Sequence, residues 1–415
     1  MTSTPGTNWS GSFRYAFRDF HRPSSIDELC EAVRSSQKIK VLGSRHSFNA
    51  IADGDVALLL ADMPMAPELN ATKTAVTIAG HATYGDLAAF LNAHGLAVHN
   101  LASLPHISIA GAIATATHGS GRRNGNLATS VSGLQIMTAD GNVIDTRRGD
   151  PEFSGLVVHL GALGVVTRVT LDVEPSYEVA QSVYEGMRWD ALYENLEAIM
   201  SAGYSVSVFT RWGDEAGQVW VKRRDLSAEV PTDLHGARLA SVKRHPLSGL
   251  DPVNVTDQLG EPGLWSDRLP HFKMGFTPSN GDEIQSEFHI PFAAGSAAIK
   301  AVVAVRDRFA HLVQAAEFRA VAADDLWLSP QFGRDTLSMH FTWVNDSAGV
   351  DAAVRHVEKA LEPFDARPHW GKVFTEAYAG SHYPMIDRFK ALREKLDPTR
   401  KFSNRWLEAV VLCGD

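Results

Sequence analysis

A run of small residues, IAGAIATATHGSG at residues 109–121, is the largest accumulation of Gly, Ala, Ser and Thr in the chain. Small side chains leave backbone N–H groups unshielded, which suits close contact with a pyrophosphate or with the edge of a flavin. A tightly packed turn without a ligand would use the same residue types. A Rossmann fingerprint fits less well, because Asn124 stands where the third glycine is required.

A second glycine turn, GSRHSF at residues 43–48, follows the short apolar run IKVL. Gly43, Ser44 and Ser47 place groups suited to phosphate oxygens on either side of His46. A histidine in such a loop could equally be a structural or surface residue. Two glycine-rich turns in one strand-rich region could instead bind opposite ends of a dinucleotide.

The pattern of the chain changes near residue 175. Before it, short apolar strands alternate with glycine turns, and IMTADGNVID predicts a hairpin with Asp140 and Gly141 at a two-residue turn. After it, longer strands alternate with helices, which we expect near residues 189–202, 293–309 and 351–363. This α+β pattern predicts a domain boundary near residue 175, and the length of 415 residues predicts two or three domains.

Further helices are predicted over YGDLAAFLNAHG at residues 84–95 and over YPMIDRFKALREKL at residues 383–396. Residues 225–282 are rich in Pro, Asp and Gly with little periodicity, which predicts long loops.

Composition limits the partners. A net charge of −9 and a pI near 6.0 disfavour nucleic acid or an anionic membrane surface. Cys30 and Cys413 are the only cysteines and lie near opposite ends, which disfavours a disulfide framework or a thiolate metal site. The N-terminus has no basic-then-apolar leader, and no apolar run approaches the roughly 18 residues of a membrane span. We therefore expect a cytoplasmic protein without a membrane or nucleic-acid partner, and we also expect a monomer.

Three strands after residue 175 alternate polar with apolar residues. Their polar pairs are Gln285 and Glu287, Glu317 and Arg319, and His340 and Thr342. Residues two apart on a strand share a face, so the opposite face would carry Phe288, Phe318, Phe341 and Trp343. A solvated sheet face would give the same alternation. The mixture of both charges with hydrogen-bonding groups also suits a polyhydroxylated ligand.

The segment RPHWGKVF, residues 367–374, places Lys372 after an aromatic residue and a glycine. A lysine near the end of a strand or helix is commonly solvated. A buried lysine could instead polarise a hydroxyl or help to deprotonate it, and the sequence leaves both roles open.

The sequence resembles the bacterial alditol (xylitol) oxidases in motifs that occur in family order: VLGSRHSF, NLASLPHISIAGAIATATHGSG, LGALGVVT, QSEF, HFTWV, RPHWGKVF and DPTRKFSN. These enzymes are a branch of the vanillyl-alcohol-oxidase-like (PCMH-type) flavoproteins, which also contain the aldonolactone oxidases. The motifs span residues 41–404. The resemblance implies an α+β flavoprotein of two domains. An FAD-binding domain with small β-sheets would comprise residues 1–175 and 371–415, and a substrate domain with a large antiparallel sheet flanked by helices would comprise residues 176–370.

The resemblance also implies one FAD per chain, joined covalently through its 8α-methyl carbon to His46, and no metal. The other cofactor contacts that it implies are Gly43, Ser44, Arg45, Ser47, Ser103, Ser108, Gly111, His118, Gly119, Ser120 and Val165. The family often has glycine where Arg45 stands. An arginine can still donate its backbone N–H and pair with a phosphate.

The substrate residues that the resemblance implies are Ser103, Gln285, Glu317, Arg319, His340, Thr342 and Lys372. The expected reaction oxidises a terminal CH2–OH of an acyclic polyol such as xylitol or sorbitol, with hydride transfer to flavin N5 and formation of H2O2 from O2. Lys372 and Arg319 are expected to stabilise the developing negative charge. His340 is expected to accept the proton, and Glu317 to bind hydroxyls and orient Arg319.

Three other functions stay open at this point. An aldonolactone oxidase or dehydrogenase would share much of the fold and a similar HWGK element, and quinones or dyes could replace oxygen as acceptor. A non-catalytic carbohydrate-binding protein would use the polar sheet face alone. A metal hydrolase would need His99, His106 and His118, whose spacing matches no ligand pattern.

Overall fold

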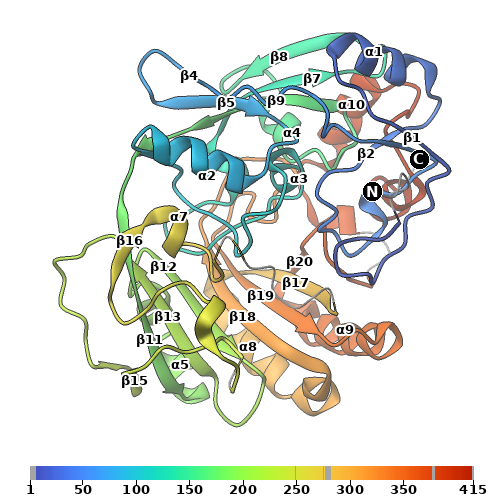
Figure 1. Ribbon diagram of the computed structural model, residues 1–415. Coiled ribbons are helices and arrows are strands. Elements are labelled where there is room, and N and C mark those ends of the chain that lie inside the picture. Colours follow the sequence, from blue (N-terminus) through green and yellow to red (C-terminus); the bar gives the residue numbers. More distant parts are fainter. Residues whose placement is uncertain (1–5, 248, 274, 276–281, 376–378, 414–415) are drawn as a thin grey trace.

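Two hydrophobic cores organise the chain. The computed structural model describes residues 6–247, 249–273, 275, 282–375 and 379–413 (Figure 1). One core joins the N-terminal sheets and helices to the C-terminal segment, with Val169 and Phe389 among its buried residues. The other lies between the largest sheet and its helices, with Phe318 and Phe341 fully buried. The first core fills the upper part of Figure 1 and the second fills the lower part.

The upper part is built on small sheets. Its five-stranded antiparallel sheet has the order β4 (Glu68–Leu69), β5 (Ala75–Ala79), β9 (Val165–Asp172), β7 (Val131–Met137) and β8 (Val143–Arg147). A parallel sheet contains β1 (Asp19–His21), β3 (Val56–Leu58) and β2 (Lys40–Val41), and β6 (Leu96–Ala97) pairs with β10 (Glu174–Pro175). The helices of this part are α1 (Ile26–Ser35), α2 (Tyr84–Ala93), α3 (Ile109–Ala114), α4 (Phe153–Val157) and α10 (Ile386–Leu396). The helices predicted at residues 84–95 and 383–396 are thus confirmed.

The predicted hairpin forms between β7 and β8, but its turn is longer than two residues. The Thr138 N–H donates to the Asn142 carbonyl, and the Gly141 N–H donates to the Thr138 carbonyl. Gly141 alone has a positive φ, of 81°. The Asp140 carboxylate accepts from the Thr138 hydroxyl and the Asn142 N–H. These side-chain bonds favour a loop closed by one left-handed glycine over a turn with two left-handed residues.

The C-terminal segment lies against the start of the chain. The Ile39 N–H donates to the Lys401 carbonyl over 3.0 Å, and the buried Lys40 ammonium donates to the Phe402 carbonyl over 3.0 Å. Helix α10 also contacts α4. Segments more than 300 residues apart in the sequence therefore form one packed unit at the top of Figure 1.

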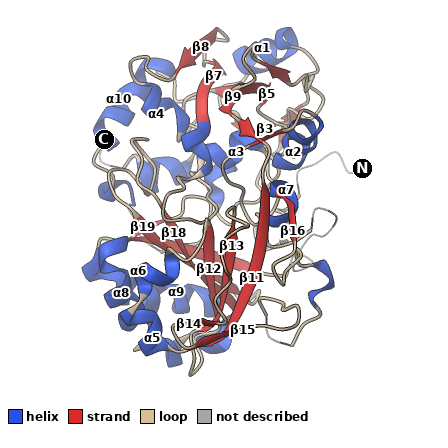
Figure 2. Cartoon of the chain, turned by 90° about the vertical axis from the view of Figure 1, so that its left-hand side faces the viewer, coloured by secondary structure: helices blue, strands red, loops and turns tan. Residues whose placement is uncertain are grey.

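The lower part contains a ten-stranded sheet. Its central strands follow in the order β11 (Glu178–Met187), β13 (Gly217–Arg223), β12 (Ser205–Thr210), β18 (Val313–Val321), β19 (Thr336–Trp343), β17 (Ile284–Pro291) and β20 (Arg367–Pro368). Short strands β14 (Asp233–Leu234), β15 (Ala237–Leu239) and β16 (Pro262–Leu264) join the edge at β11. Figure 2 shows helices gathered on one side of this sheet, namely α5 (Trp189–Glu194), α6 (Leu196–Met200), α8 (Gly295–Val303) and α9 (Ser347–Leu361).

The three helical regions predicted after residue 175 are present with altered bounds. The first is divided at Asn195 into α5 and α6, and the second ends at Val303 and continues as short 3-10 turns. Helix α7 (Trp265–Arg268) and three short strands occupy part of the predicted loop region 225–282. Residues 248, 274 and 276–281 of that region lie outside the described residues, as do residues 1–5 of the segment from which a leader was judged absent.

Strand register aligns the polar residues of the sheet. His340 on β19 pairs directly with Glu287 on β17 and with Glu317 on β18. Thr342 pairs with Gln285 in the same way. The alternating residues Phe288, Phe318, Phe341 and Trp343 pack in the core with the helices. The predicted division of the strands into one polar and one apolar face is confirmed.

In the part of the chain that the structure describes, no helix has the length and apolar character needed to cross a membrane.

Candidate active site

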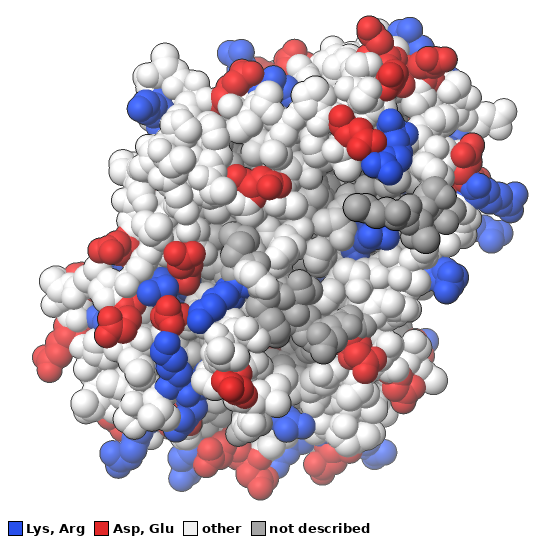
Figure 3. Space-filling view, in the orientation of Figure 1, with Lys and Arg blue, Asp and Glu red and all other residues white. Residues whose placement is uncertain are grey.

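A cavity of about 1360 Å³ lies between the two parts of the molecule. Its walls come from the glycine turn 43–48, from residues 102–118, from Gly161 to Val166 and from the polar face of the large sheet. Apolar residues such as Leu42 and Ile107 alternate with the hydroxyls of serines and threonines along these walls. Over the face seen in Figure 3, Lys and Arg lie interspersed with Asp and Glu, so no single sign of charge surrounds the molecule there.

The two glycine-rich turns are in direct contact. The Ser44 hydroxyl accepts a hydrogen bond of 3.0 Å from the Ser108 N–H. A Cβ on Gly43 would come within 2.6 Å of the Ser108 hydroxyl oxygen, so the first turn needs glycine there for close approach. The two turns therefore meet at the cavity wall, and their binding of a dinucleotide stays a prediction.

His46 is held at the wall of the cavity. Its Nδ1 lies 3.0 Å from the Ser44 hydroxyl oxygen, and its ring stacks on Trp9 with 5.4 Å between ring centroids. Burial, reinforced by His106, lowers the pKa of His46 to about 4. The imidazole is therefore neutral at pH 7 and has an unprotonated ring nitrogen available for bonding.

Arg45 adopts the left-handed backbone conformation, with φ 61°. Glycine reaches this conformation without steric cost, whereas a residue with a Cβ pays about 1–2 kcal/mol. The loop thus keeps the geometry of a glycine turn although arginine occupies the position, and Arg45 also lines the cavity.

The second glycine-rich segment contributes only part of its residues to the cavity. Ser108, Gly111 and His118 line it. Gly119 and Ser120 lie behind the wall, because Gly119 packs against Asn100 and the Ser120 hydroxyl donates to the Val206 carbonyl. The Cβ direction of Gly119 and the side chain of Ser120 point away from the cavity, so only their backbone could contact a cofactor, and both contacts stay predictions.

Val165 also lies away from the cavity surface. Its side chain is fully buried in a small core with Leu29 and Phe402, while its neighbours Gly164 and Val166 line the cavity. Only its backbone could approach a cofactor.

Glu287 occupies the centre of one polar cluster on the sheet wall. The Lys372 ammonium donates to its Oε2 over 2.5 Å, and the Ser338 hydroxyl and His118 contact its Oε1. Burial alone would raise the pKa of Glu287, but Lys372 and His118 outweigh burial and hold it well below its usual value. Glu287 is therefore a buried anion.

His340 lies beside this ion pair. Its Nδ1 is 2.8 Å from the Lys372 nitrogen, and its Nε2 is 3.1 Å from the Thr342 hydroxyl oxygen. Because the ammonium only donates, Nδ1 accepts, and the ring proton lies on Nε2. Burial and the charge of Lys372 lower the pKa of His340 to about 4, so the ring is neutral at pH 7.

A second cluster surrounds Glu317 and Arg319. The Arg319 guanidinium donates through Nε to Glu317 Oε1 over 2.6 Å and through Nη2 to Oε2. The same Nη2 also donates to the Ser103 hydroxyl, which brings the substrate-side serine of the upper part to the sheet. Burial opposes ionisation of Glu317, yet Arg319 and His271 hold the pKa of this carboxyl well below its usual range. The polar pairs on the strands are thus joined into two ion-paired clusters.

The outer part of the wall carries Gln285 and Thr342, which line the cavity next to each other in register. The Gln285 amide nitrogen donates to the buried Glu283 carboxylate. All the predicted substrate residues therefore line one cavity.

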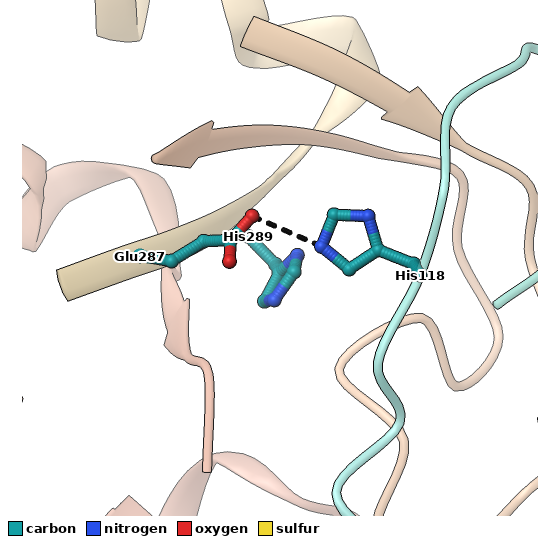
Figure 4. A group of neighbouring side chains, drawn as sticks. All are labelled: His118, Glu287 and His289. Carbon is teal, nitrogen blue, oxygen red and sulfur yellow. Dashed lines mark hydrogen bonds and ion pairs between the residues drawn. The ribbon is translucent and has the colours of Figure 1, made fainter. Parts of the chain in front are cut away.

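His118, Glu287 and His289 form the one group in the described residues whose ligand atoms all lie within 4.8 Å, the arrangement that a metal would need (Figure 4). The Gln331 amide nitrogen lies 3.1 Å from His289 Nδ1, so Nδ1 accepts and the proton of the neutral ring occupies Nε2. Lys372 already neutralises Glu287. Lys372, the Ser338 hydroxyl and His118 already occupy the Glu287 carboxylate, which disfavours a metal there, although His289 Nε2 has no hydrogen-bond partner among the described residues. The set of His99, His106 and His118 does not gather among the described residues.

Sequence reasoning missed three residues of the site. Glu287 stood in a recognised alternating pair but received no role, although a carboxylate on the same face as Gln285 was a usable signal. His271 and His369 line the cavity from loops, where no periodicity marks them.

Comparison with known proteins agrees with this geometry. A family model described as an FAD binding domain matches residues 20–147, and one described as D-arabinono-1,4-lactone oxidase matches residues 278–410. Solved structures of similar fold include a solvent-stable cholesterol oxidase, with a TM-score of 0.77 at 15% identity over 97% of this chain and 96% of that chain. A cholesterol oxidase from B. sterolicum gives a TM-score of 0.76 at 15% identity over 98% and 96%. The fold and the site define an FAD-dependent oxidoreductase of the PCMH type.

Sequence relatives narrow this class. An alditol oxidase of Streptomyces sp. is 46% identical over 99% of both chains. An L-gulono-1,4-lactone dehydrogenase of Mycobacterium tuberculosis is 28% identical over 98% of both chains, and the L-gulonolactone oxidase of Mus musculus is 26% identical over 97% of both. The chain belongs to the alditol oxidase family.

The residues around the cavity fit FAD. Hydroxyls of Ser44, Ser47, Ser108 and Thr117 and the Arg45 side chain can bind phosphate oxygens, and apolar residues such as Leu160 and Val166 can contact flat rings. The volume exceeds what a drug-sized ligand needs, so a dinucleotide and a small substrate fit together.

Proposed function

We propose that this enzyme oxidises the terminal primary hydroxyl of alditols such as xylitol and sorbitol to the aldose: R–CH2OH + O2 → R–CHO + H2O2. The observation that carries the proposal is the pair of buried clusters, Glu287 with Lys372 and Glu317 with Arg319, on one wall of the cavity. The full-length similarity to an alditol oxidase supports the same substrate class. When bound, FAD would supply the two-electron acceptor for substrate and the route of electrons to O2.

We further propose that His46 is bonded covalently to the 8α-methyl carbon of FAD. Its imidazole is neutral and lines the cavity, which supports this role. Forming the N–C bond removes one hydrogen from the methyl group and one from the imidazole, and O2 accepts both as H2O2. The other contacts assigned to FAD are Gly43, Ser44, Arg45, Ser47, Ser108, Gly111 and His118.

The wall residues would act on the substrate hydroxyl as follows. Lys372 and Arg319 donate hydrogen bonds to the oxygen on which negative charge develops, a contribution of about 3 kcal/mol for one donor. His340 is the proposed proton acceptor; because its Nδ1 already accepts from Lys372, the proton would reach the neutral ring through the Lys372 ammonium, which gives one proton to Nδ1 as it takes up the hydroxyl proton. The low pKa of His340 makes it a weak base, so the proton moves as the hydride leaves and the carbonyl forms.

Recognition of the remaining hydroxyls is assigned to Ser103, Gln285, Glu317 and Thr342. Hydroxyls both donate and accept, so they match a wall that offers carboxylate, amide and hydroxyl groups together. These groups would hold the polyol with its terminal carbon near the flavin, which supplies much of the rate through orientation.

A sugar-lactone oxidase or dehydrogenase is the second candidate, because the lactone oxidase model matches residues 278–410. Purified enzyme should form H2O2 from xylitol and sorbitol much faster than from L-gulono-1,4-lactone or D-arabinono-1,4-lactone. The reverse order would replace the proposed substrate class. Oxygen consumption measured against reduction of a quinone or dye identifies the acceptor.

We also propose that the protein is cytoplasmic and a monomer. Size-exclusion chromatography with light scattering tests the monomer against the chain mass of 45.1 kDa.

A further inference from the structure

His271 is a buried histidine whose ring lies under the second polar cluster, and the proposed reaction gives it no part. Its side chain is 7% exposed, and its Nε2 lies 2.8 Å from Glu317 Oε1. Phe209 and Trp220 pack edge-on against the ring at centroid distances of 5.1 Å and 5.8 Å. The ring is thereby confined in an aromatic enclosure with one polar side toward Glu317.

The loop that carries His271 is fixed at several points. The Thr256 N–H donates to the His271 carbonyl over 3.0 Å, and the Thr256 hydroxyl donates to the Pro270 carbonyl over 2.9 Å. The fully buried Lys222 on β13 donates to the Leu269 carbonyl over 2.5 Å and to the Pro270 carbonyl over 3.0 Å. Hydrogen bonds from Thr256 and Lys222 to three successive carbonyls therefore position this loop.

The neighbours of His271 also fix the position of its proton. The Lys222 nitrogen lies 3.4 Å from His271 Nδ1, while Glu317 faces Nε2. Burial lowers the pKa of His271 to about 4 although Glu317 opposes the decrease, so the ring is neutral. Because the Glu317 carboxylate only accepts, the single ring proton lies on Nε2 and is donated to Glu317. Arg319 Nη2 lies 3.1 Å from the same Nε2, so the ring contacts both partners of the ion pair. Both ring nitrogens are in use, and neither is left for a ligand.

Glu317 connects His271 to Arg319 through hydrogen bonds. The carboxylate accepts from His271 and from Arg319 Nε on Oε1, and from Arg319 Nη2 on Oε2. Without His271, the hydrogen bonds of the Glu317 carboxylate to described residues would be reduced to those from Arg319, so less would hold the carboxylate plane. The Arg319 guanidinium also donates to the Ser103 hydroxyl, and its orientation toward Ser103 depends on the orientation of the Glu317 carboxylate.

We propose that His271 is a positioning residue that orients Glu317 and, through it, the Arg319 guanidinium toward the reacting hydroxyl. The proposal rests on the proposed function, since Arg319 matters only if substrate oxygen binds beside it. It assigns to the long loop region a role in building the site. Residues that hydrogen-bond to substrate-binding groups hold those groups in place. A displacement of a substrate-binding group by about 1 Å can cost 100-fold in rate.

The test compares His271→Gln with His271→Leu. Gln keeps an N–H that can reach Glu317, whereas Leu keeps apolar volume and loses the donor. We expect His271→Leu to lower the limiting rate of anaerobic flavin reduction by xylitol about 100-fold. We expect His271→Gln to stay within about tenfold of the unsubstituted enzyme. A role in core packing alone predicts the opposite order, because Leu suits an aromatic enclosure better than Gln does. That opposite order, or equal rates for both variants, would overturn the proposal.

A double-mutant cycle tests whether His271 acts through Glu317. In the Glu317→Gln background, His271→Leu should change the reduction rate by less than about threefold, because the group that it positions is already altered. The full 100-fold loss in both backgrounds would refute action through Glu317. Flavin content and thermal unfolding of each variant confirm that the holoenzyme is intact.

The unsubstituted enzyme separates this inference from the proposed function. Absence of polyol-dependent reduction there would refute the alditol oxidase activity, and the same variants would then be compared with the lactone that does reduce the flavin. Normal polyol turnover with an unaffected His271→Leu variant would refute the role of His271 alone.

Discussion

Replacing Lys372 with Met should lower both the free energy of unfolding and the rate of flavin reduction, and the two effects have separable causes. The side chains of Glu287 and Lys372 are 3% and 17% exposed, so this ion pair is largely removed from water. Removing one partner of a buried pair costs about 3–5 kcal/mol, because the other charge stays buried without compensation. His118 and the Ser338 hydroxyl still contact Glu287, which favours the lower value, about 3 kcal/mol.

The stability loss should depend on pH. In the unsubstituted enzyme the folded pKa of Glu287 is lowered, so its contribution is present above the unfolded pKa of about 4.3 and disappears as the pH falls. Without Lys372, burial would raise the folded pKa of Glu287, and the variant would lose stability as the pH rises. The difference between the two proteins in urea unfolding should therefore be large at pH 8 and smaller at pH 5.

A matched double variant, Glu287→Gln with Lys372→Met, separates the two effects. It removes both charges, so most of the stability should return, while the donor to the developing alkoxide stays absent. Flavin reduction by xylitol should remain 100- to 1000-fold slow in both variants, on the order of 3–4 kcal/mol of lost transition-state stabilisation. A Lys372→Met enzyme as stable as the unsubstituted one at pH 8 would refute the buried ion pair. Normal reduction would refute the assigned role of Lys372.

Three further outcomes follow from the site. Acid-precipitated enzyme should stay yellow and His46→Ala should release its flavin into the supernatant; a colourless pellet of the unsubstituted enzyme would reject the covalent bond. Arg45→Gly should raise the free energy of unfolding by about 0.5–1 kcal/mol, because relief of the left-handed strain exceeds the added entropy of the unfolded chain; a net loss in chemical denaturation would contradict this. Treatment with a chelator should leave peroxide formation unchanged, since Lys372, Ser338 and His118 already occupy the Glu287 carboxylate; restoration of a lost activity by a divalent metal would contradict this.

Local patterns in the sequence were sufficient where one strand or turn decides the outcome. The alternation around Glu317 and around His340 predicted which face each residue occupies, because the period of a strand is fixed by backbone geometry. The turn at residue 43 was predicted from its glycine and serines, and the absence of a Cβ there leaves room for the Ser108 hydroxyl. The hairpin at Gly141 was predicted in place, but side-chain bonds of Asp140 decided its loop length.

Contacts between segments that are distant in the sequence could not be predicted from local patterns. The direct pairing of Glu287, His340 and Glu317 depends on the strand order β18, β19, β17, which does not follow the order of these strands in the chain. His271 comes from a loop without periodicity, and only tertiary contacts with Lys222 and Thr256 place it. Gly119 and Ser120 share the composition of a phosphate loop, yet packing against Asn100 and β12 turns them inward.

The charge balance of the sheet wall predicts selectivity toward neutral substrates. Glu287 is compensated by Lys372 and Glu317 by Arg319, so neither cluster offers an unpaired charge to a ligand. An aldonate or an amino alditol would have to lose its hydration without gaining a free counter-charge, at a cost of several kcal/mol. A hydroxyl can accept from the ammonium and guanidinium and donate to the carboxylates, and it disturbs neither pair. The same pairing that keeps buried charges stable would therefore admit polyols and disfavour their charged analogues.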